Sequence, residues 1–440
     1  MSELTVVGAG LAGSEAAWQA AERGCWVRLL EMRPVRMTAA HKSGAFAELV
    51  CSNSLRGTGR EHAVGVLKDE MRLLGSLVLA AADAHAVPAG AALAVDRDAF
   101  AAHITDALQR HPRITVYRGV VTAVPEGPCI IATGPLTAEE LAQAVADFVG
   151  SRCLAFYDAA APIIAADSIA AERVYRASRY GKGPAEAYVN CPFERDEYRA
   201  FREALCTAET APREAFDPTP FFEGCLPVEE MARRGEDTLR FGPLKPVGLP
   251  DPRTGRIPYA VAQLRPENNA ETLFNLVGFQ TSLRFAEQRR VFQLIPGLER
   301  AEFERYGVMH RNTFLCSPRC LWPTLQARRR RDLWFAGQLT GVEGYVESAA
   351  GGLVAGIGAA RLLHGEQPVA PPRETVIGAL CHYVAESDPE HFQPMNAAFG
   401  LLPPLIEAVR HRRSRRQRLA ERALTAIRAY AAAMAADTGS

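Results

Sequence analysis

Short apolar runs alternate with helical stretches at the beginning of the chain. Residues 4–7 (Leu-Thr-Val-Val) form an apolar run of the kind that makes a buried parallel strand. A glycine-rich segment follows at once, then a helical stretch over 14–23 and a second apolar run over 27–30 that ends at Glu31. This order and these lengths predict a β-α-β unit, the building block of a parallel sheet covered by helices.

The glycine-rich segment fits the pattern G-x-G-x-x-G. Gly8 would make the tight turn, Gly10 would let a pyrophosphate approach the backbone, and Gly13 would let the helix pack on the strand. The N–H groups at the start of the helix favour phosphates, and Glu31 stands where a carboxylate would bond ribose hydroxyls. A glycine-rich turn before an ordinary helix would not explain Glu31, so the segment predicts dinucleotide binding. The six residues of the motif are Gly8, Ala9, Gly10, Leu11, Ala12 and Gly13.

Two later segments resemble the parts of flavoproteins that return to the dinucleotide. Residues 129–135 are predicted to form a short buried strand that ends in glycine and proline, and residues 333–336 form another apolar strand. Together with the first motif they favour FAD over NAD. Glycine and alanine over 349–363 predict a helix that approaches the cofactor or sheet closely, with a tightly packed helix as the alternative. The residues expected on this side of the cofactor are Gly337, Gln338 and Glu343.

The middle of the chain has a different texture. From about residue 185 to residue 305, prolines, charges and short mixed periods predict an inserted domain with its own sheet. A length of 440 residues also exceeds one ordinary core. The predicted fold class is α/β: an FAD-binding Rossmann-like domain with a parallel sheet, interrupted by an inserted α+β domain. The expected parts are 1–184 and 306–440 for the FAD-binding domain and 185–305 for the insertion, with a basic C-terminal helix at the end.

Charge is balanced over the whole chain but not along it. The chain has 50 Lys and Arg residues and 50 Asp and Glu residues, so its formal net charge is zero. This balance argues against a surface that binds nucleic acid all over, but it is compatible with a local basic patch. Residues 401–430 hold eight arginines against Glu407 and Glu421. This tail could bind phosphates, with a basic solvated helix as the alternative. Apolar residues recur there at helical spacing and predict an amphipathic helix: Leu419, Ala423, Ile427, Tyr430 and Met434.

The cysteines point to a few candidate sites. None of the ten forms C-x-x-C, so zinc ribbons and thioredoxin-type motifs have no support and we expect no metal site. Most lie in apolar or helical contexts and should behave as small hydrophobes. Cys51 and Cys225 lie in polar, loop-like segments and are the candidates for chemistry. No leader peptide is visible and no uncharged apolar run reaches about 18 residues, so we expect a cytoplasmic protein without a membrane span.

Several longer motifs resemble one family, the folate- and FAD-dependent tRNA (uracil-5-)-methyltransferases called TrmFO. The resemblance covers nearly all of the chain. The related GidA, or MnmG, flavoproteins share the late glycine-tyrosine-glutamate motif but lack the cysteine pair in these contexts and carry longer C-terminal helical domains. The motifs are Glu31-Met32-Arg33-Pro34, Val50-Cys51-Ser52-Asn53-Ser54-Leu55, Phe222-Glu223-Gly224-Cys225-Leu226-Pro227, Tyr306-Gly307-Val308-Met309-His310-Arg311-Asn312 and Gly341-Val342-Glu343-Gly344-Tyr345-Val346-Glu347-Ser348-Ala349.

The resemblance implies an enzyme that forms 5-methyluridine in the T arm of tRNA. Methylenetetrahydrofolate would give the carbon, reduced FAD would carry it, and NADH or NADPH would supply the electrons. Cys225 would add to uracil carbon 6, because carbon 5 is a poor nucleophile until a thiolate does so. Cys51 would have a supporting catalytic role. No second nicotinamide-binding unit is visible, so folate and the pyridine nucleotide are expected to visit the same flavin face by turns.

Three other interpretations stay open at the level of sequence. One is a flavin-dependent dithiol oxidoreductase that uses Cys51 and Cys225 as a redox pair. Another is a GidA-like flavoprotein that modifies the wobble uridine of tRNA. The third is a non-catalytic, FAD-stabilised RNA-binding protein, in which both cysteines could be replaced at no cost.

Overall fold

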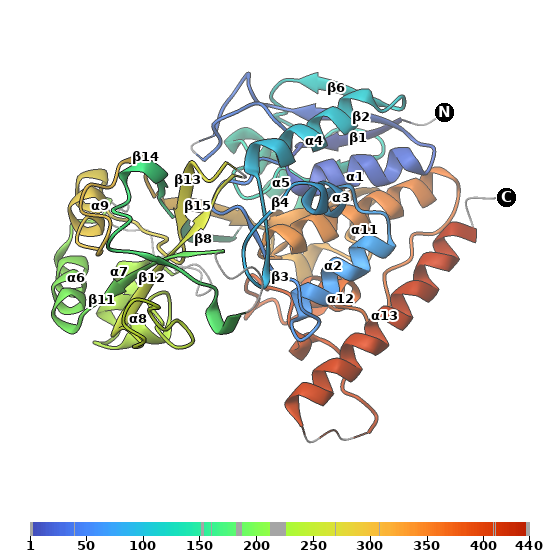
Figure 1. Cartoon of the computed structure of the whole chain (residues 1–440). Coiled ribbons are helices and arrows are strands. Elements are labelled where there is room, and N and C mark those ends of the chain that lie inside the picture. Colours follow the sequence, from blue (N-terminus) through green and yellow to red (C-terminus); the bar gives the residue numbers. More distant parts are fainter. Residues whose placement is uncertain are drawn as a thin grey trace.

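The computed structural model consists of two lobes (Figure 1). The larger lobe is built from both ends of the chain, and the smaller lobe comes from its middle. The structure describes residues 3–38, 40–150, 154–159, 161–181, 187–211, 226–268, 270–307, 309–407, 409 and 411–436.

A six-stranded sheet forms the centre of the larger lobe. Its strands are parallel except β16, and β1 lies between β2 and β7, with Val6 beside Leu29 and Ile130. The predicted β-α-β unit is therefore confirmed, and the two later strands stand next to it. The strands are, in order across the sheet, β16 (Gln326–Ala327), β17 (Arg330–Phe335), β7 (Cys129–Ile131), β1 (Glu3–Val7), β2 (Trp26–Glu31) and β6 (Ile114–Arg118).

Helices cover both faces of this sheet. Helices α1 (Leu11–Glu22) and α11 (Tyr345–Leu363) pack along one another on one face, and α5 (Glu139–Val149) packs on the other. A Cβ atom at Gly352 would lie 2.0 Å from the Ala12 carbonyl oxygen. The small residues of α11 thus serve helix–helix packing at this point, which is the alternative that the sequence left open.

Further helices cover α1 and α11 from outside (Figure 1). The helical composition of residues 63–82 resolves into two helices because the chain turns at Gly75, with φ +73°. The apolar positions predicted along the tail are all buried against this layer, which confirms the amphipathic helix. The helices are α2 (Ala63–Leu73), α3 (Leu77–Ala84), α4 (Arg97–Arg110), α12 (Val376–Glu386) and α13 (Arg412–Ala436). The short helix α10 (Ser317–Cys320) packs against α12.

The smaller lobe has its own six-stranded sheet. Strands β9 and β10 belong to it although they precede residue 185, so we propose that the insertion begins near residue 160. Helices α6 (Arg195–Thr207), α7 (Val228–Arg233), α8 (Thr238–Phe241) and α9 (Phe285–Phe292) accompany it. The strands are, in order, β10 (Tyr175–Arg176), β11 (Val189–Phe193), β12 (Ala260–Pro266), β13 (Leu273–Leu276), β9 (Ile163–Ala165) and β14 (Phe303–Arg305).

Two short sheets complete the described part of the chain. Strands β8 (Leu154–Ala159) and β15 (Met309–Phe314) form an antiparallel pair. Strands β3 (Ser54–Gly57), β5 (Ala92–Val95) and β4 (Ala86–Val87) form the other sheet, directly after the first cysteine loop.

Among the described residues, one helix, α11, is long and apolar enough to cross a membrane by length and composition alone. In this fold 83% of its apolar window is buried inside the protein. Its burial against α1 and the sheet accounts for that composition.

Candidate functional site

The carboxyl ends of three parallel strands, β1, β7 and β17, lie at one pocket. The turns after β1, β7 and β17 contain Gly8, Ala132 and Gly337, and all three residues line the pocket. Because β7 lies between β1 and β17, these turns meet although they are far apart in sequence. The pocket encloses about 1030 Å³ of space outside the atoms, part of it open to solvent. A crevice at the carboxyl ends of parallel strands is where α/β sheets of this kind bind ligands.

The glycines of the first turn have different structural tasks. Gly8 has φ +94°, and a Cβ atom there would lie 2.7 Å from the Ala132 carbonyl oxygen. A Cβ atom at Gly13 would lie 1.7 Å from the carbonyl oxygen of Gly8, so this position keeps α1 close to the turn. At Gly10 an added Cβ would meet nothing within 4 Å, and this residue lines the pocket. Protein packing therefore explains Gly8 and Gly13, whereas a ligand in the pocket would explain Gly10.

Glu31, at the end of β2, lines the same pocket. Its Oε2 accepts the Ala9 N–H at 2.7 Å, and its Oε1 accepts two N–H groups of Arg33, each at 2.9 Å. Burial would raise the pKa of this carboxyl, but the Arg33 charge and the N–H donors outweigh it and lower the pKa. Glu31 is thus an ionised acceptor with lone pairs to spare for hydroxyl groups.

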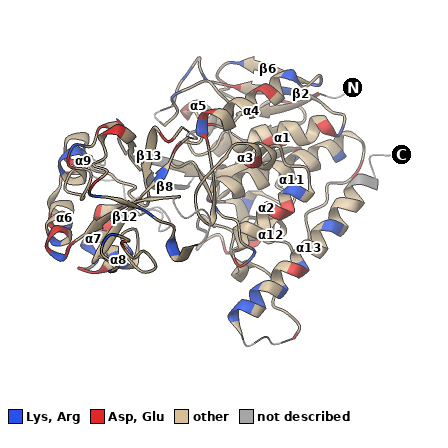
Figure 2. Ribbon diagram, in the orientation of Figure 1, with Lys and Arg blue, Asp and Glu red and all other residues tan. Residues whose placement is uncertain are grey.

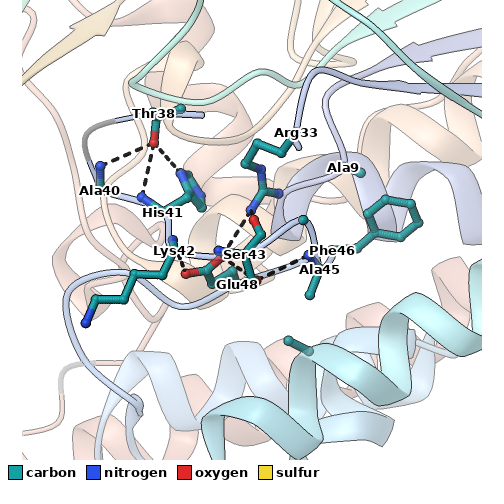
Figure 3. Close-up of polar contacts among 12 residues, drawn as sticks. Ala9, Arg33, Thr38, Ala40, His41, Lys42, Ser43, Ala45, Phe46 and Glu48 are labelled. Atoms are coloured by element: carbon teal, nitrogen blue, oxygen red, sulfur yellow. Dashed lines mark hydrogen bonds and ion pairs between the residues drawn. The ribbon is translucent and has the colours of Figure 1, made fainter. Parts of the chain in front are cut away.

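A loop between β2 and the first cysteine segment borders the pocket (Figure 3). Glu48 accepts the backbone N–H groups of Lys42 and Ser43 at 2.8 and 3.1 Å, and Arg33 Nη1 at 3.3 Å. Thr38 Oγ1 accepts the His41 N–H at 3.2 Å. Sequence reasoning missed residues 38–48 of this loop, because apart from Arg33 its hydrogen-bonding residues lie outside the motifs identified in the sequence.

The sequence-predicted cofactor residues divide into three groups. Ala9 and Gly13 lie behind the pocket wall, where Ala9 binds Glu31 and Gly13 contacts the turn. Glu343 accepts a hydrogen bond from Gln338 and reaches the pocket through it. Seven residues line the pocket directly: Gly8, Gly10, Leu11, Ala12, Glu31, Gly337 and Gln338.

Cys51 lies beside the pocket, held by a tyrosine from α11. Its Sγ is 2.8 Å from the Tyr345 Oη, and its backbone N–H donates to the same oxygen at 2.7 Å. Tyr345 lines the pocket, so it connects the cysteine to the cofactor space. Burial raises the pKa of Tyr345 well above its usual range, and nearby Cys51 adds to this, so the phenol stays neutral.

Arginines from both lobes fix the cysteine loop. Arg265 on β12 donates to Ser52 Oγ at 2.7 Å and to Asn53 Oδ1 at 2.8 Å. Arg97 at the start of α4 donates to the Leu49 carbonyl oxygen at 2.6 Å and pairs with Glu267. These contacts join the loop to the smaller lobe and place positive charge near the thiol. Nothing in the sequence signalled them, because the partners are more than 40 positions away.

Cys225, the other candidate cysteine, lies outside the residues that the structure describes.

Two acidic residues that follow Cys225 in the sequence make hydrogen bonds or ion pairs with other residues of the smaller lobe. Glu229 on α7 is buried and accepts hydrogen bonds from Thr281 Oγ1 at 2.8 Å and Ser282 Oγ at 2.6 Å. Glu230 pairs with Arg233. These carboxylates are committed to structural contacts.

The buried cysteines behave as packing residues. Cys129 lies in the sheet, and burial raises the pKa of its thiol to about 12. Burial likewise raises the pKa of Cys381, on α12, to about 12. Thiols with such pKa values are inert near neutral pH. Their contexts agree with the prediction that most of the cysteines act as small hydrophobes.

The pocket and the sheet define the class of this protein, the flavoproteins with an FAD-binding Rossmann-like domain. A solved structure supports this fold: GidA from Aquifex aeolicus, with a TM-score of 0.67 at 17% identity over 98% of this chain and 76% of that one. The predicted fold class is therefore confirmed.

Sequence relatives define the family. The family model described as "Glucose inhibited division protein A" matches residues 3–367. A methylenetetrahydrofolate–tRNA-(uracil-5-)-methyltransferase TrmFO from Symbiobacterium thermophilum is 62% identical over 97% of both chains. The TrmFO of Enterococcus faecalis is 58% identical over 96% of this chain and 97% of its own length. The chain belongs to the TrmFO family, a branch of the wider GidA family, as its motifs predicted.

Proposed function

We propose that this chain forms 5-methyluridine in the T arm of tRNA, with methylenetetrahydrofolate as carbon donor and NADH or NADPH as electron source. Methyl transfer to carbon 5 of uracil in tRNA, with the carbon taken from methylenetetrahydrofolate, is the activity named for its relatives. The observation that carries the proposal is the Cys51–Tyr345 contact at the edge of a dinucleotide pocket. A thiol at that edge is where uracil chemistry has to meet the flavin.

FAD fits the residues that are present. The Gly8–Gly10 turn and the start of α1 would hold its pyrophosphate, and Glu31 would hold the ribose hydroxyls. Gly337 and Gln338 would border the flavin end. When bound and reduced, FAD supplies the one-carbon carrier and the reducing equivalents.

Cys51 and Tyr345 would control a proton beside the flavin. Their hydrogen bond, 2.8 Å long, lets the neutral phenol donate to a thiolate or accept from a thiol. Arg97, which donates to the Leu49 carbonyl oxygen, places a positive charge that interacts with this thiol. We assign Cys51 the supporting role in catalysis, in which it protects the reacting carbon or moves a proton.

Cys225 would be the nucleophile. Its thiolate adds to carbon 6 of uracil, and carbon 5 then attacks the electrophilic one-carbon unit. A base would then take the proton from carbon 5, the methylene would leave its carrier, and a hydride equivalent that comes from NADH or NADPH would reduce it to a methyl group. Departure of the thiolate from carbon 6 would restore the double bond of the ring. Acidic neighbours would oppose the thiolate, but Glu229 and Glu230 are held by their own partners.

Fluorinated RNA tests these roles. T-arm RNA that carries 5-fluorouracil at the target position should form a covalent complex, because fluorine blocks the elimination that frees the thiol. Peptide mapping should find the RNA on Cys225, and Cys225→Ala should form no complex and no 5-methyluridine while it keeps its FAD and oxidises NADPH. An adduct on Cys51 would reverse the two roles; no adduct, with methylation by Cys225→Ala, would refute the mechanism.

A further inference from the structure

A second and larger cavity lies at the N-terminal end of α13, apart from the dinucleotide pocket. It holds about 1980 Å³ of space outside the atoms, part of it open to solvent. Its walls come from residues 56–64, 397–409 and 412–419. In Figure 2, Lys and Arg positions are concentrated along the ribbon at this end of α13. The cavity is thus bordered by the basic tail that the sequence singled out.

The arginines at the N-terminal end of α13 carry positive charges that are placed unfavourably unless an anion lies beside them. Arg412, Arg413 and Arg415 are exposed, and among the described residues their guanidinium groups have no ion pair or hydrogen bond. The first turn of α13 contains no acidic residue. Positive side chains at the N-terminus of a helix oppose its dipole, and neighbours one turn apart repel each other. An anion in the cavity would remove both penalties.

Acidic residues offset only part of this charge. Glu61 and Glu407 line the cavity, and Glu407 pairs with Arg418 at 2.8 Å. Arg416 donates to the backbone carbonyl oxygen of Glu61 at 3.2 Å, so its charge is not neutralised by that contact. The cavity wall keeps an excess of positive charge.

A second basic run, the four arginines of residues 328–331, gives a comparison, because two of its members are held by structural contacts. Arg329 donates to the Phe148 carbonyl oxygen at 2.9 Å, and Arg330 donates to the Pro125 carbonyl oxygen at 2.8 Å. Arg330 also pairs with Asp332. Arg329 and Arg330 are thus held by contacts within the fold, whereas among the described residues Arg412, Arg413 and Arg415 on α13 have no such contacts.

The cavity extends toward the cysteine site. Arg56 lines it, and its Nη1 pairs with Glu347 Oε1 at 3.1 Å. Glu347 follows Tyr345 by two positions on α11, and Tyr345 holds Cys51. Arg56 is five residues after Cys51, a span of at most about 18 Å. A polymer bound in the cavity could therefore reach the thiol.

We propose that this cavity is a groove that binds the sugar-phosphate backbone of the tRNA substrate and leads the target uridine to the Cys51 side of the pocket. The proposal rests on the function proposed above. Arg412 and Arg415 on the groove wall, with the exposed Arg413 beside them, bind phosphates, and the apolar wall residues Phe399 and Leu405 receive base or ribose faces. An RNA strand combines these two features, whereas a free phosphate would use only the first.

Salt-dependent binding tests the groove. In the triple variant Arg412→Gln, Arg413→Gln, Arg415→Gln, the Kd for an unmodified tRNA transcript should rise about tenfold or more near 0.15 M salt. The slope of log Kd against log salt should fall by about 2 to 3, because about three phosphate contacts are lost. Binding is measured without folate or NADPH, so it does not depend on methylation.

A charge-matched control gives the comparison. Arg256→Gln, Arg289→Gln, Arg300→Gln removes three exposed arginines of the smaller lobe and should leave the Kd and the slope near wild type. The proposal would be overturned if the slope were unchanged in the α13 variant, or if the control variant lost as much affinity for tRNA as the α13 variant does. A change of oligomeric state in sedimentation would also overturn it, because the groove would then be a contact between copies. If tRNA binds as expected but its T-arm uridine is never methylated, the proposed function fails and the groove stands.

Discussion

At the scale of single residues, Gly10 and Gly13 belong to one motif but should fail in different ways. Gly10 has φ −71° and ψ −169°, a conformation that any residue adopts, and a Cβ there meets no protein atom. Gly10→Val should therefore fold with a near wild-type melting temperature but contain no flavin, since its side chain occupies the place of the pyrophosphate. Absorbance at 450 nm per protein, on the order of zero in the variant, is the readout.

Gly13→Ala is the matched comparison. Its Cβ would collide with the Gly8 carbonyl oxygen, so we expect a loss of stability of more than about 2 kcal/mol, or no soluble protein. A yellow, stoichiometrically loaded Gly10→Val would remove the basis for the cofactor site.

The Cys51–Tyr345 contact leads to a second prediction at this scale. Cys51→Ala should keep FAD and tRNA binding but lose methylation. Tyr345→Phe, which removes only the hydroxyl that bonds the thiol, should lower the methylation rate about a hundredfold, the order expected for a lost proton-transfer group. The half-buried Cys206 provides the control, because Cys206→Ala should methylate at the wild-type rate. Wild-type methylation by Cys51→Ala would exclude the assigned role.

At the scale of elements, a buried carboxyl caps α12. Glu70 accepts the N–H groups of Val376 and Ile377 at 2.8 and 2.9 Å, and burial raises its pKa to about 8. Between about pH 4.5 and pH 8 the folded protein keeps a proton that the unfolded chain has lost. This group therefore makes stability fall as pH rises through that window, by up to about 1.4 kcal/mol per pH unit.

Glu70→Gln cannot titrate, so its melting temperature should fall less steeply with pH over that window than that of the wild type. The exposed Glu421→Gln should keep the wild-type pH dependence. Parallel pH profiles of Glu70→Gln and the wild type would show that the carboxyl does not hold its proton in the fold.

Elements whose pattern is local could be predicted from the sequence. The strand–glycine–helix unit, the two later strands and the buried face of α13 all follow from apolar periodicity and turn residues. The site depends on contacts that periodicity does not encode. Tyr345 is part of a sequence motif, but nothing in the motif indicates that its hydroxyl contacts Cys51. Arg97 and Arg265 lie on different lobes, so their contacts with the cysteine loop form only when the two lobes pack together.

At the scale of the whole molecule, the order of strands brings the site together. The turns that contain residues 8, 132 and 337 meet because β7 lies between β1 and β17. Sequence could indicate that the three turns belong to one cofactor, but the start of the inserted lobe was expected at 185 while β9 already joins its sheet at Ile163. A three-residue strand carries too little pattern to reveal which sheet it joins.

Transfer of a labelled carbon tests the central claim most directly. Purified protein with unmodified tRNA, NADPH and methylenetetrahydrofolate labelled with ¹³C in its methylene group should give tRNA whose nucleoside digest contains 5-methyluridine with one ¹³C. Fragment mapping should place it in the T arm. Unlabelled product, label at the anticodon wobble uridine, or no methylated uridine from protein that retains FAD would contradict the account.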